Sequence, residues 1–358
     1  MRAAVLREVG QPLSIEEVDT SPLHPREVLV QVAAAGLCHS DLHFIDGEYE
    51  TDLPAVLGHE SAGVVEEVGD QVQYVAPGDH VITCLSVFCG ECDHCTRGRP
   101  NLCVQRDLVN RASGEPSRLH QRGRTIHQCL NTSSFAEKQL VHERAVVKVR
   151  DEMPLDRAAL IGCSVTTGLG TVFRTAGVRP GESVVVIGCG GVGLAAVQGA
   201  RIAGANQIIA VDRVAPKLDL ARHVGATDAI DTVDAVAAVL DMTGGVHHAF
   251  EAAGTPATAK QGFLMLRPGG TLTIMGLIPG GRVVELPGDH FFAERKVQGS
   301  ALGSNRFRTD MPQYVDMYLD GRLLLDEMIS ERIGLEDVNR GFARMRSGEH
   351  ARSVIMFE

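Results

Sequence analysis

Residues 183–212 have the sequence SVVVIGCGGVGLAAVQGARIAGANQIIAVD, in which two apolar runs are joined by a glycine-rich turn and a helical segment. The runs SVVVIG and QIIAVD lack polar alternation, which is typical of strands buried on both faces. Between them, GLAAVQGARIAGA has the apolar spacing of a helix. The alternation continues through APKLDLARHVGA, HHAFEAAG and TLTIMG. Strands that alternate with helices predict a doubly wound parallel sheet, an α/β fold.

The turn GCGGVG places Gly188, Gly190 and Gly193 in the pattern G-x-G-x-x-G, after a predicted strand and before a predicted helix. Glycines there let the backbone approach a pyrophosphate at the helix N-terminus, where free N–H groups favour an anion. Asp212 ends the next strand, 19 residues after Gly193. Its carboxylate would bind the adenosine ribose hydroxyls and repel a 2′-phosphate. The pattern predicts NAD(H) rather than NADP(H), a preference that the adjacent Arg213 weakens.

Four cysteines lie within the fifteen residues CGECDHCTRGRPNLC, in the pattern Cys-x2-Cys-x2-Cys-x7-Cys. This close spacing lets four thiolates converge tetrahedrally on one Zn²⁺. Disulfides are a weaker interpretation, because three cysteines two residues apart cannot pair among themselves without strain. Iron–sulfur clusters usually have longer gaps or a trailing Cys-Pro. We therefore predict a structural zinc held by Cys89, Cys92, Cys95 and Cys103.

Length and composition set limits on the class of protein. With 358 residues, two domains are expected, each large enough to bury a core. The 34 Lys and Arg against 45 Asp and Glu give a net charge of −11, which disfavours nucleic acid and membrane surfaces as partners. No apolar run is long enough to span a membrane. Nine cysteines without an export signal predict a reducing, cytoplasmic location.

The first 150 residues differ in pattern from the α/β segment. Short strand-like runs such as EVLVQVAAAG, SAGVVEEVG and DHVITCLSV are separated by Gly and Pro, which predicts a β-rich domain. Beyond residue 303 the chain predicts helices in DMPQYVDMYLDGRLLL and LEDVNRGFARMRSGE, followed by a strand in SVIMF. The pattern alone leaves this tail open to either domain.

The motifs GHESAGVVEEVG, GCSVTTG and GCGGVG, together with the cysteine lobe, closely resemble those of zinc-containing alcohol dehydrogenases of the medium-chain dehydrogenase/reductase superfamily. The resemblance covers essentially the whole chain. It implies a GroES-like β-rich catalytic domain over residues 1–163 and a Rossmann NAD-binding domain over residues 164–302. Residues 303–358 would then return to the catalytic domain. The long loop at residues 104–131 resembles the branch that includes glutathione-dependent formaldehyde dehydrogenases.

The resemblance implies a second, catalytic zinc, so that the chain would bind two Zn²⁺. Its three protein ligands would be Cys38, His59 and Cys163. Three ligands leave one position open for water or an alcohol oxygen. Asp41 matches the carboxylate that orients the ligand imidazole. Glu60 stands where the family has an acid near the metal.

Other roles are also implied by the resemblance. Ser40 and His43 match the family's proton relay, the hydroxyl toward the nicotinamide ribose and the imidazole toward solvent. His39 stands where many relatives carry an Arg that binds the cofactor pyrophosphate. The further positions are Thr167, Val192, Lys217 and Arg352 for the cofactor, and Tyr49 and Leu85 for the substrate pocket.

The implied function is reversible hydride transfer between a primary alcohol or aldehyde and NAD(H). Three alternatives stay open: a nicotinoprotein that keeps NAD(H) bound and uses an external electron acceptor, a thiol-adduct formaldehyde dehydrogenase, and a non-catalytic nucleotide-binding protein. Asp107 stands where the glutathione-dependent enzymes carry an Arg, so glutathione is disfavoured as the thiol. The intact set of zinc ligands with Ser40 argues against a non-catalytic protein. A homodimer or homotetramer is expected.

Overall fold

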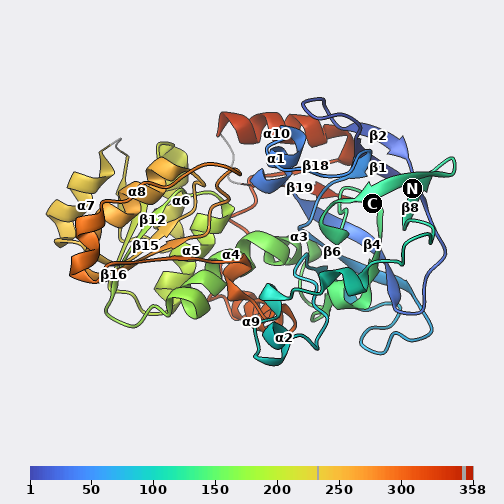
Figure 1. The fold of residues 1–358 in the computed structure, drawn as a ribbon, viewed down its shortest axis with the longest axis horizontal. Helices are drawn as coiled ribbons and strands as arrows, with labels where there is room; N and C mark the ends of the chain where they lie inside the picture. Colours follow the sequence, from blue (N-terminus) through green and yellow to red (C-terminus); the bar gives the residue numbers. More distant parts are fainter. Residues whose placement is uncertain (232–233, 349–351, 358) are drawn as a thin grey trace. The chain divides into compact units, whose positions relative to one another are not determined.

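The computed structural model describes residues 1–231, 234–348 and 352–357, which form two compact units (Figure 1). Unit 1 contains Met1–Cys163, Arg306–Gly321 and Ile329–Glu358. Unit 2 contains Ser164–Asn305 and Arg322–Met328. Most of the C-terminal tail therefore packs with the N-terminal segment.

The larger sheet of unit 1 has seven strands in the order β11-β7-β6-β4-β19-β18, with β10 also paired to β4. The central strand β4, Glu27–Gly36, is mostly buried and pairs antiparallel with β6, β10 and β19. Since β19 comes from the end of the chain, the tail completes this sheet. The other strands are β6 (Ser61–Val68), β7 (His80–Thr83), β10 (Lys138–His142), β11 (Val146–Lys148), β18 (Glu331–Ile333) and β19 (Ser353–Met356).

A second sheet of unit 1 has six short strands in the order β2-β1-β5-β9-β8-β3. These are β1 (Arg2–Leu6), β2 (Ser14–Glu17), β3 (Asp19–Thr20), β5 (Ala55–Val56), β8 (Leu119–Gln121) and β9 (Arg124–Gln128). The helices of unit 1 are α1 (His39–Ile45), α2 (Asp93–Thr96), α3 (Leu155–Leu160), α9 (Phe307–Leu319) and α10 (Val338–Ser347). One core cluster joins side chains of β4, α1 and α10, among them Ala35, Leu42 and Phe342.

Unit 2 is a parallel sheet in the order β14-β13-β12-β15-β16-β17. Counted within the unit, the order is 3-2-1-4-5-6, the dinucleotide-binding arrangement. The strands are β12 (Ser183–Ile187), β13 (Gln207–Val211), β14 (Asp228–Ile230), β15 (Val246–Glu251), β16 (Leu266–Ile274) and β17 (Lys296–Gly299). The helices are α4 (Thr166–Gly170), α5 (Gly191–Ile202), α6 (Ala215–Val224), α7 (Ala235–Thr243) and α8 (Pro256–Leu264).

The predicted fold class is confirmed: a β-rich unit accompanies a doubly wound parallel sheet. Three details differ from the sequence patterns. The strand predicted in DHVITCLSV ends at Thr83, ahead of the cysteine lobe. The chain enters unit 1 again at Arg306 rather than at residue 303, and Arg322–Met328 belongs to unit 2 instead of the catalytic domain. That short segment packs there because Gln198 of α5 binds the backbone of Leu324 through both its amide atoms. No described helix is long and apolar enough to cross a bilayer.

A buried ion cluster fixes the long loop of unit 1 to the start of β4. The Glu27 carboxylate, 2% exposed, binds Arg111 Nε at 3.0 Å and Arg118 Nε at 2.6 Å. Arg118 also donates to the backbone oxygen of Val109, and Arg111 to that of Pro22. Burial alone would raise the pKa of Glu27, but the bonds from both arginines and from a backbone N–H hold that pKa at about 2.

We expect Glu27→Gln to lower the free energy of unfolding at pH 7 by about 2–3 kcal/mol, because two buried guanidinium groups lose their counter-charge. A carboxyl with a depressed folded-state pKa stabilises the native state above its unfolded pKa, and this contribution is lost as pH falls through the folded pKa. The difference between wild type and variant should therefore shrink as pH falls from about 4.5 to about 2. Urea titrations across that range measure it.

Glu66→Gln is the matched control, since Glu66 forms a solvent-exposed pair with Lys138 at 2.7 Å. Its loss should stay below about 1 kcal/mol. Equal losses for the two variants at pH 7 would contradict the role given to Glu27.

Candidate zinc and dinucleotide sites

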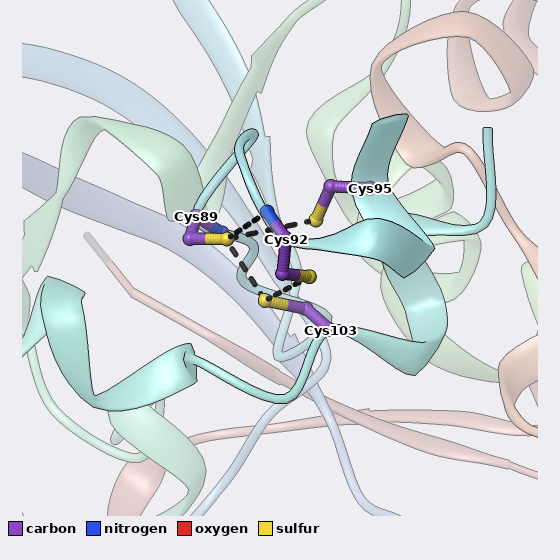
Figure 2. Close-up of side chains that lie close together, drawn as sticks. All are labelled: Cys89, Cys92, Cys95 and Cys103. Carbon is purple, nitrogen blue, oxygen red and sulfur yellow. Dashed lines mark hydrogen bonds between the residues drawn. The ribbon is translucent and has the colours of Figure 1, made fainter. Parts of the chain in front are cut away.

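The four cysteines of the lobe converge on one point (Figure 2). Their ligand atoms all lie within 4.8 Å of one another, and the Sγ atoms of Cys89 and Cys95, like those of Cys92 and Cys103, are 3.9 Å apart. Four sulfurs around a tetrahedral zinc at about 2.3 Å would be separated by about 3.8 Å. The donor set therefore fits the structural zinc predicted from the spacing.

Backbone groups of the lobe prepare the thiols for a metal. Cys89 Sγ accepts N–H bonds from Glu91 at 3.3 Å and Cys92 at 3.2 Å, and Cys103 Sγ accepts the Cys89 N–H at 3.3 Å. The N–H groups of Cys95 and Val104 lower the pKa of the Cys92 thiol to about 6. Because the thiolate is the metal-binding form, these donors favour metal binding at Cys89 and Cys92, whereas burial raises the pKa of the Cys95 thiol to about 12.

Unit 1 holds a second cluster, made of Cys38, His59 and Cys163, whose ligand atoms also lie within 4.8 Å of one another. All three side chains are buried. Cys38 precedes α1, His59 precedes β6, and Cys163 lies in the π-helical turn Ile161–Val165 that follows α3. Two sulfurs and one imidazole form a donor set that zinc accepts, and three ligands leave a coordination position open.

The Asp41 carboxylate orients this cluster. It lies 3.1 Å from His59 Nδ1 and accepts N–H bonds from Cys38 at 3.1 Å and Gly58 at 3.2 Å. With Nδ1–H directed at Asp41, the His59 ring keeps Nε2 free for a metal. Burial would lower the pKa of His59, but the Asp41 charge raises it well above its ordinary value. That Asp41 orients a zinc ligand stays a prediction.

Glu60 and Arg352 bring opposite charges to the same cluster. Glu60 is fully buried, and its Oε1 lies 3.6 Å from Arg352 Nε. Arg352 is 4% exposed and donates to the backbone oxygen of Leu37. A hydrogen bond from the Cys163 thiol, assisted by the positive charges of His59 and Arg352, lowers the pKa of Cys38. A contact of Arg352 with cofactor phosphates stays a prediction.

In unit 2 the glycine-rich turn follows β12, beside the point where the strand order reverses. Gly188 has φ +95° and lies so close to the Ala253 backbone that a Cβ would meet its nitrogen at 2.9 Å. At Gly193 a Cβ would lie 1.8 Å from the Gly188 oxygen. Gly190 precedes the first turn of α5. Only glycine fits at Gly188 and Gly193, whereas a Cβ at Gly190 would meet no protein atom within 4 Å, which leaves that face of the turn open for a pyrophosphate.

Asp212 lies directly after β13, and its carboxylate is fixed by two backbone N–H groups. It accepts from Cys189 at 2.7 Å and from Val214 at 3.0 Å. A carboxylate has about four acceptor positions, so two remain for ribose hydroxyls. The neighbouring Arg213 is exposed. This geometry is the arrangement that a dinucleotide-binding unit needs at the end of its second strand.

Two family models match this chain. Residues 24–151 match the model of the alcohol dehydrogenase GroES-like domain, and residues 191–320 match that of zinc-binding dehydrogenases. The chain is 38% identical over 366 residues to S-(hydroxymethyl)glutathione dehydrogenase of Synechocystis, covering 99% of both chains. The chain belongs to the zinc-containing alcohol dehydrogenases of the medium-chain superfamily. The cofactors of this dehydrogenase are zinc and a nicotinamide dinucleotide.

Two further relatives place the dehydrogenase within this family. It is 40% identical to the NDMA-dependent alcohol dehydrogenase of Amycolatopsis methanolica, with 99% of this chain and 98% of the relative covered. It superposes on benzyl alcohol dehydrogenase of Acinetobacter calcoaceticus with a TM-score of 0.94 at 32% identity, covering 100% and 99% of the two chains.

The two residues predicted to form a proton relay, Ser40 and His43, lie on α1, three residues apart. Ser40 and His43 are partly exposed, whereas Asp41 between them is buried. Ser40 Oγ is 3.7 Å from Cys38 Sγ, so the hydroxyl lies beside a candidate zinc ligand. His43 binds the carboxylate of Glu48 through Nδ1. Glu48 was not predicted from the sequence. The signal for it was the glycine at position 47, which the structure shows with a positive φ that turns the chain back at the end of α1.

The remaining predicted positions fall in both units. In unit 1, His39 is exposed, and Tyr49 and Leu85 are half-buried. In unit 2, Thr167 is buried on α4, where Gly168 packs so closely on α5 that a Cβ would meet the Val192 oxygen at 2.5 Å. Lys217 is half-buried on α6. Their contacts with cofactor and substrate stay predictions.

Single-ligand variants should separate the two metal sites. Cys163→Ala should leave about one zinc per chain and an intact fold while lowering turnover by at least about a thousandfold, because the lobe is independent of the catalytic ligands. Cys95→Ala should instead lower the melting temperature by several degrees, since metal binding at the lobe is coupled to folding. Zinc content by atomic emission, thermal melts and alcohol oxidation rates measure these effects. Full activity of the Cys163 variant would refute its role as a ligand.

Proposed function

We propose that this dehydrogenase interconverts primary alcohols and aldehydes at a zinc held by Cys38, His59 and Cys163. The observation that carries the proposal is the donor count: the cluster offers three buried ligands, whereas the lobe offers four. A three-ligand site leaves a position for the substrate oxygen, and a four-ligand site is closed. When bound, zinc would act there as a Lewis acid toward the substrate hydroxyl, and NAD⁺ would accept the hydride.

The residues of the chain supply the remaining chemistry. Asp41 and the Glu60–Arg352 pair hold the ligand groups in a buried, charged environment. Oxidation of an alcohol releases one proton in addition to the hydride, and a site that excludes water needs a path for that proton. Ser40 and His43 supply a hydroxyl and an imidazole on α1 for this path.

We propose NAD(H) as the cofactor because Asp212 is fixed at the end of β13. A 2′-phosphate placed near this carboxylate would be repelled and would displace ribose hydrogen bonds. A cytoplasmic location is proposed from the nine cysteines, none of which forms a disulfide, as suits a reducing compartment.

Wild type should therefore prefer NAD⁺ to NADP⁺ by at least about a hundredfold in kcat/KM, equivalent to roughly 3 kcal/mol. Asp212→Gly should narrow that ratio, assisted by Arg213. Asp212→Asn keeps an oxygen for the two backbone N–H groups, so it separates loss of charge from loss of loop geometry. Asp219→Asn, on exposed α6 surface beside Arg222, is the control and should not change the ratio. Equal use of both cofactors by wild type would overturn the assignment.

A second candidate is a nicotinoprotein, in which NAD(H) stays bound and an external acceptor takes the electrons. The NDMA-dependent relative at 40% identity favours this alternative. A third, a thiol-adduct formaldehyde dehydrogenase, is supported by the Synechocystis relative. The exposed acid Asp107 argues against glutathione as the thiol, because it stands where the glutathione-dependent enzymes carry an Arg.

One experiment distinguishes these candidates. The purified protein is assayed for zinc per chain and for nucleotide released on denaturation, and alcohols are then screened with added NAD⁺ and with NDMA. Turnover that needs added NAD⁺ supports the first proposal, whereas co-purified nucleotide with turnover only on NDMA supports the nicotinoprotein. Oxidation of formaldehyde that needs an added thiol supports the third. No oxidation under any condition would refute all three.

We also propose a homo-oligomer of two or four copies. The edge strand β17 of unit 2 pairs only with β16 among the described residues. In the segment that precedes it in the sequence, large apolar side chains are exposed, with Phe292 at 94% and Val283 at 74%. Unpaired edges and apolar patches of this kind are typical of surfaces that a partner covers.

A further inference from the structure

A carboxylate accompanies the imidazole of the relay. His43 Nδ1 is hydrogen-bonded to Oε2 of Glu48. The His43 side chain is 20% exposed and that of Glu48 is 45% exposed, so the pair lies at the border between unit 1 and solvent. A relay of Ser40 and His43 does not by itself require an acid at this position.

The local backbone holds Glu48 against His43. The Glu48 N–H donates to the His43 oxygen at 2.8 Å, and the Tyr49 N–H donates to the same oxygen at 3.2 Å. The reversal depends on Gly47, whose φ is +74° and whose Cβ would lie 2.5 Å from a methyl carbon of Val9. The Gly10 N–H, bonded to the Ile45 oxygen at 2.6 Å, fixes the end of α1 to the loop after β1. The pair is therefore built into the turn.

Other charged and titratable groups near the ring are accounted for. Tyr49 meets the imidazole edge-on, with ring centroids 5.7 Å apart. Asp46, at the C-cap of α1, pairs with Arg346 of α10 at 2.7 Å. Glu48 is thus the acid that faces His43 in the described part of the chain.

We propose that Glu48 is a positioning residue for proton release. Its carboxylate accepts the His43 Nδ1–H, which keeps the neutral imidazole in the tautomer with Nε2 as proton acceptor. When His43 gains the proton released by alcohol oxidation, the carboxylate stabilises the imidazolium and itself stays ionised. The imidazolium then loses one proton to water, and the hydride carries both electrons to NAD⁺. This inference rests on the relay role proposed for His43.

A plain surface pair would behave differently. An exposed ion pair contributes about 1 kcal/mol or less to stability and has no effect on a reaction rate. A group that orients a catalytic partner typically changes activity by about 10–100-fold when removed. Kinetics therefore separate the two interpretations more clearly than stability does.

The test compares Glu48→Gln with Asp46→Asn, an exposed carboxylate two positions away that pairs with Arg346 instead of the ring. We expect Glu48→Gln to lower kcat/KM for alcohol oxidation about tenfold at pH 7, with the loss shrinking toward pH 9 as hydroxide takes the proton directly. Asp46→Asn should stay within about twofold of wild type, and Glu48→Asp should recover part of the rate. Stopped-flow release of protons into a pH indicator should slow only in Glu48→Gln, with NAD⁺ binding and melting temperature unchanged.

The His43→Gln background completes the test. Adding Glu48→Gln to it should cause no further loss, because Glu48 acts through His43. Equal behaviour of Glu48→Gln and Asp46→Asn, or an undiminished loss in the double variant, would overturn the inference while the relay stands. A His43→Gln variant with wild-type proton release would instead overturn the relay role of His43, and the role of Glu48 with it.

Discussion

The cluster of Cys38, His59 and Cys163 in unit 1 depends on one buried carboxylate, that of Asp41. Asp41 has no exposed surface, and moving a carboxylate out of water costs several kcal/mol unless donors replace the lost hydration. Three donors do so: the N–H groups of Cys38 and Gly58 and the ring of His59. The carboxylate thereby joins the end of β4 to the start of β6. Asp41 thus fixes two of the three candidate ligands, Cys38 and His59, through contacts that do not involve a metal.

The helix that carries Asp41 is too short to be stable alone. Helices of fewer than about 12 residues are marginal in water, and α1 spans only His39–Ile45. Asp41 caps its first turn by accepting the Cys38 N–H, and the Gly47 turn closes its last. Because burial selects one face, Asp41 points into the core while Ser40 and His43 stay accessible. Within the seven residues of α1, helical geometry therefore separates the structural residue Asp41 from Ser40 and His43, the two residues proposed for the relay.

Features that depend on residues close together in the sequence were the ones that the sequence predicted. The glycine-rich turn and the cysteine lobe are local patterns, so spacing alone predicted their chemistry. The strand β4 was predicted at Glu27–Gly36 because its apolar run is long.

The other features left no such signal. Helix α1 has fewer than two turns of apolar period, and the residues of the second cluster are distant in sequence, so that set came only from the family resemblance. The tail was ambiguous because strand pairing, rather than composition, places β19 beside β4. Glu48 was missed because its contact depends on the turn at Gly47, and a single glycine does not by itself predict which side chains a turn brings together.

The two zinc clusters differ in what they require of the fold. The lobe closes within the fifteen residues from Cys89 to Cys103, whereas the second cluster closes a loop from Cys38 to Cys163. Loop-closure entropy makes the longer closure more costly by only about 2 kcal/mol, so chain length is not the main difference. The difference is that β4, β6 and α3 must all be in place before the second set can meet. Cys163 is also the residue at which the chain first leaves unit 1, so a metal bound there would fix the first of the four points at which the chain passes between the two units.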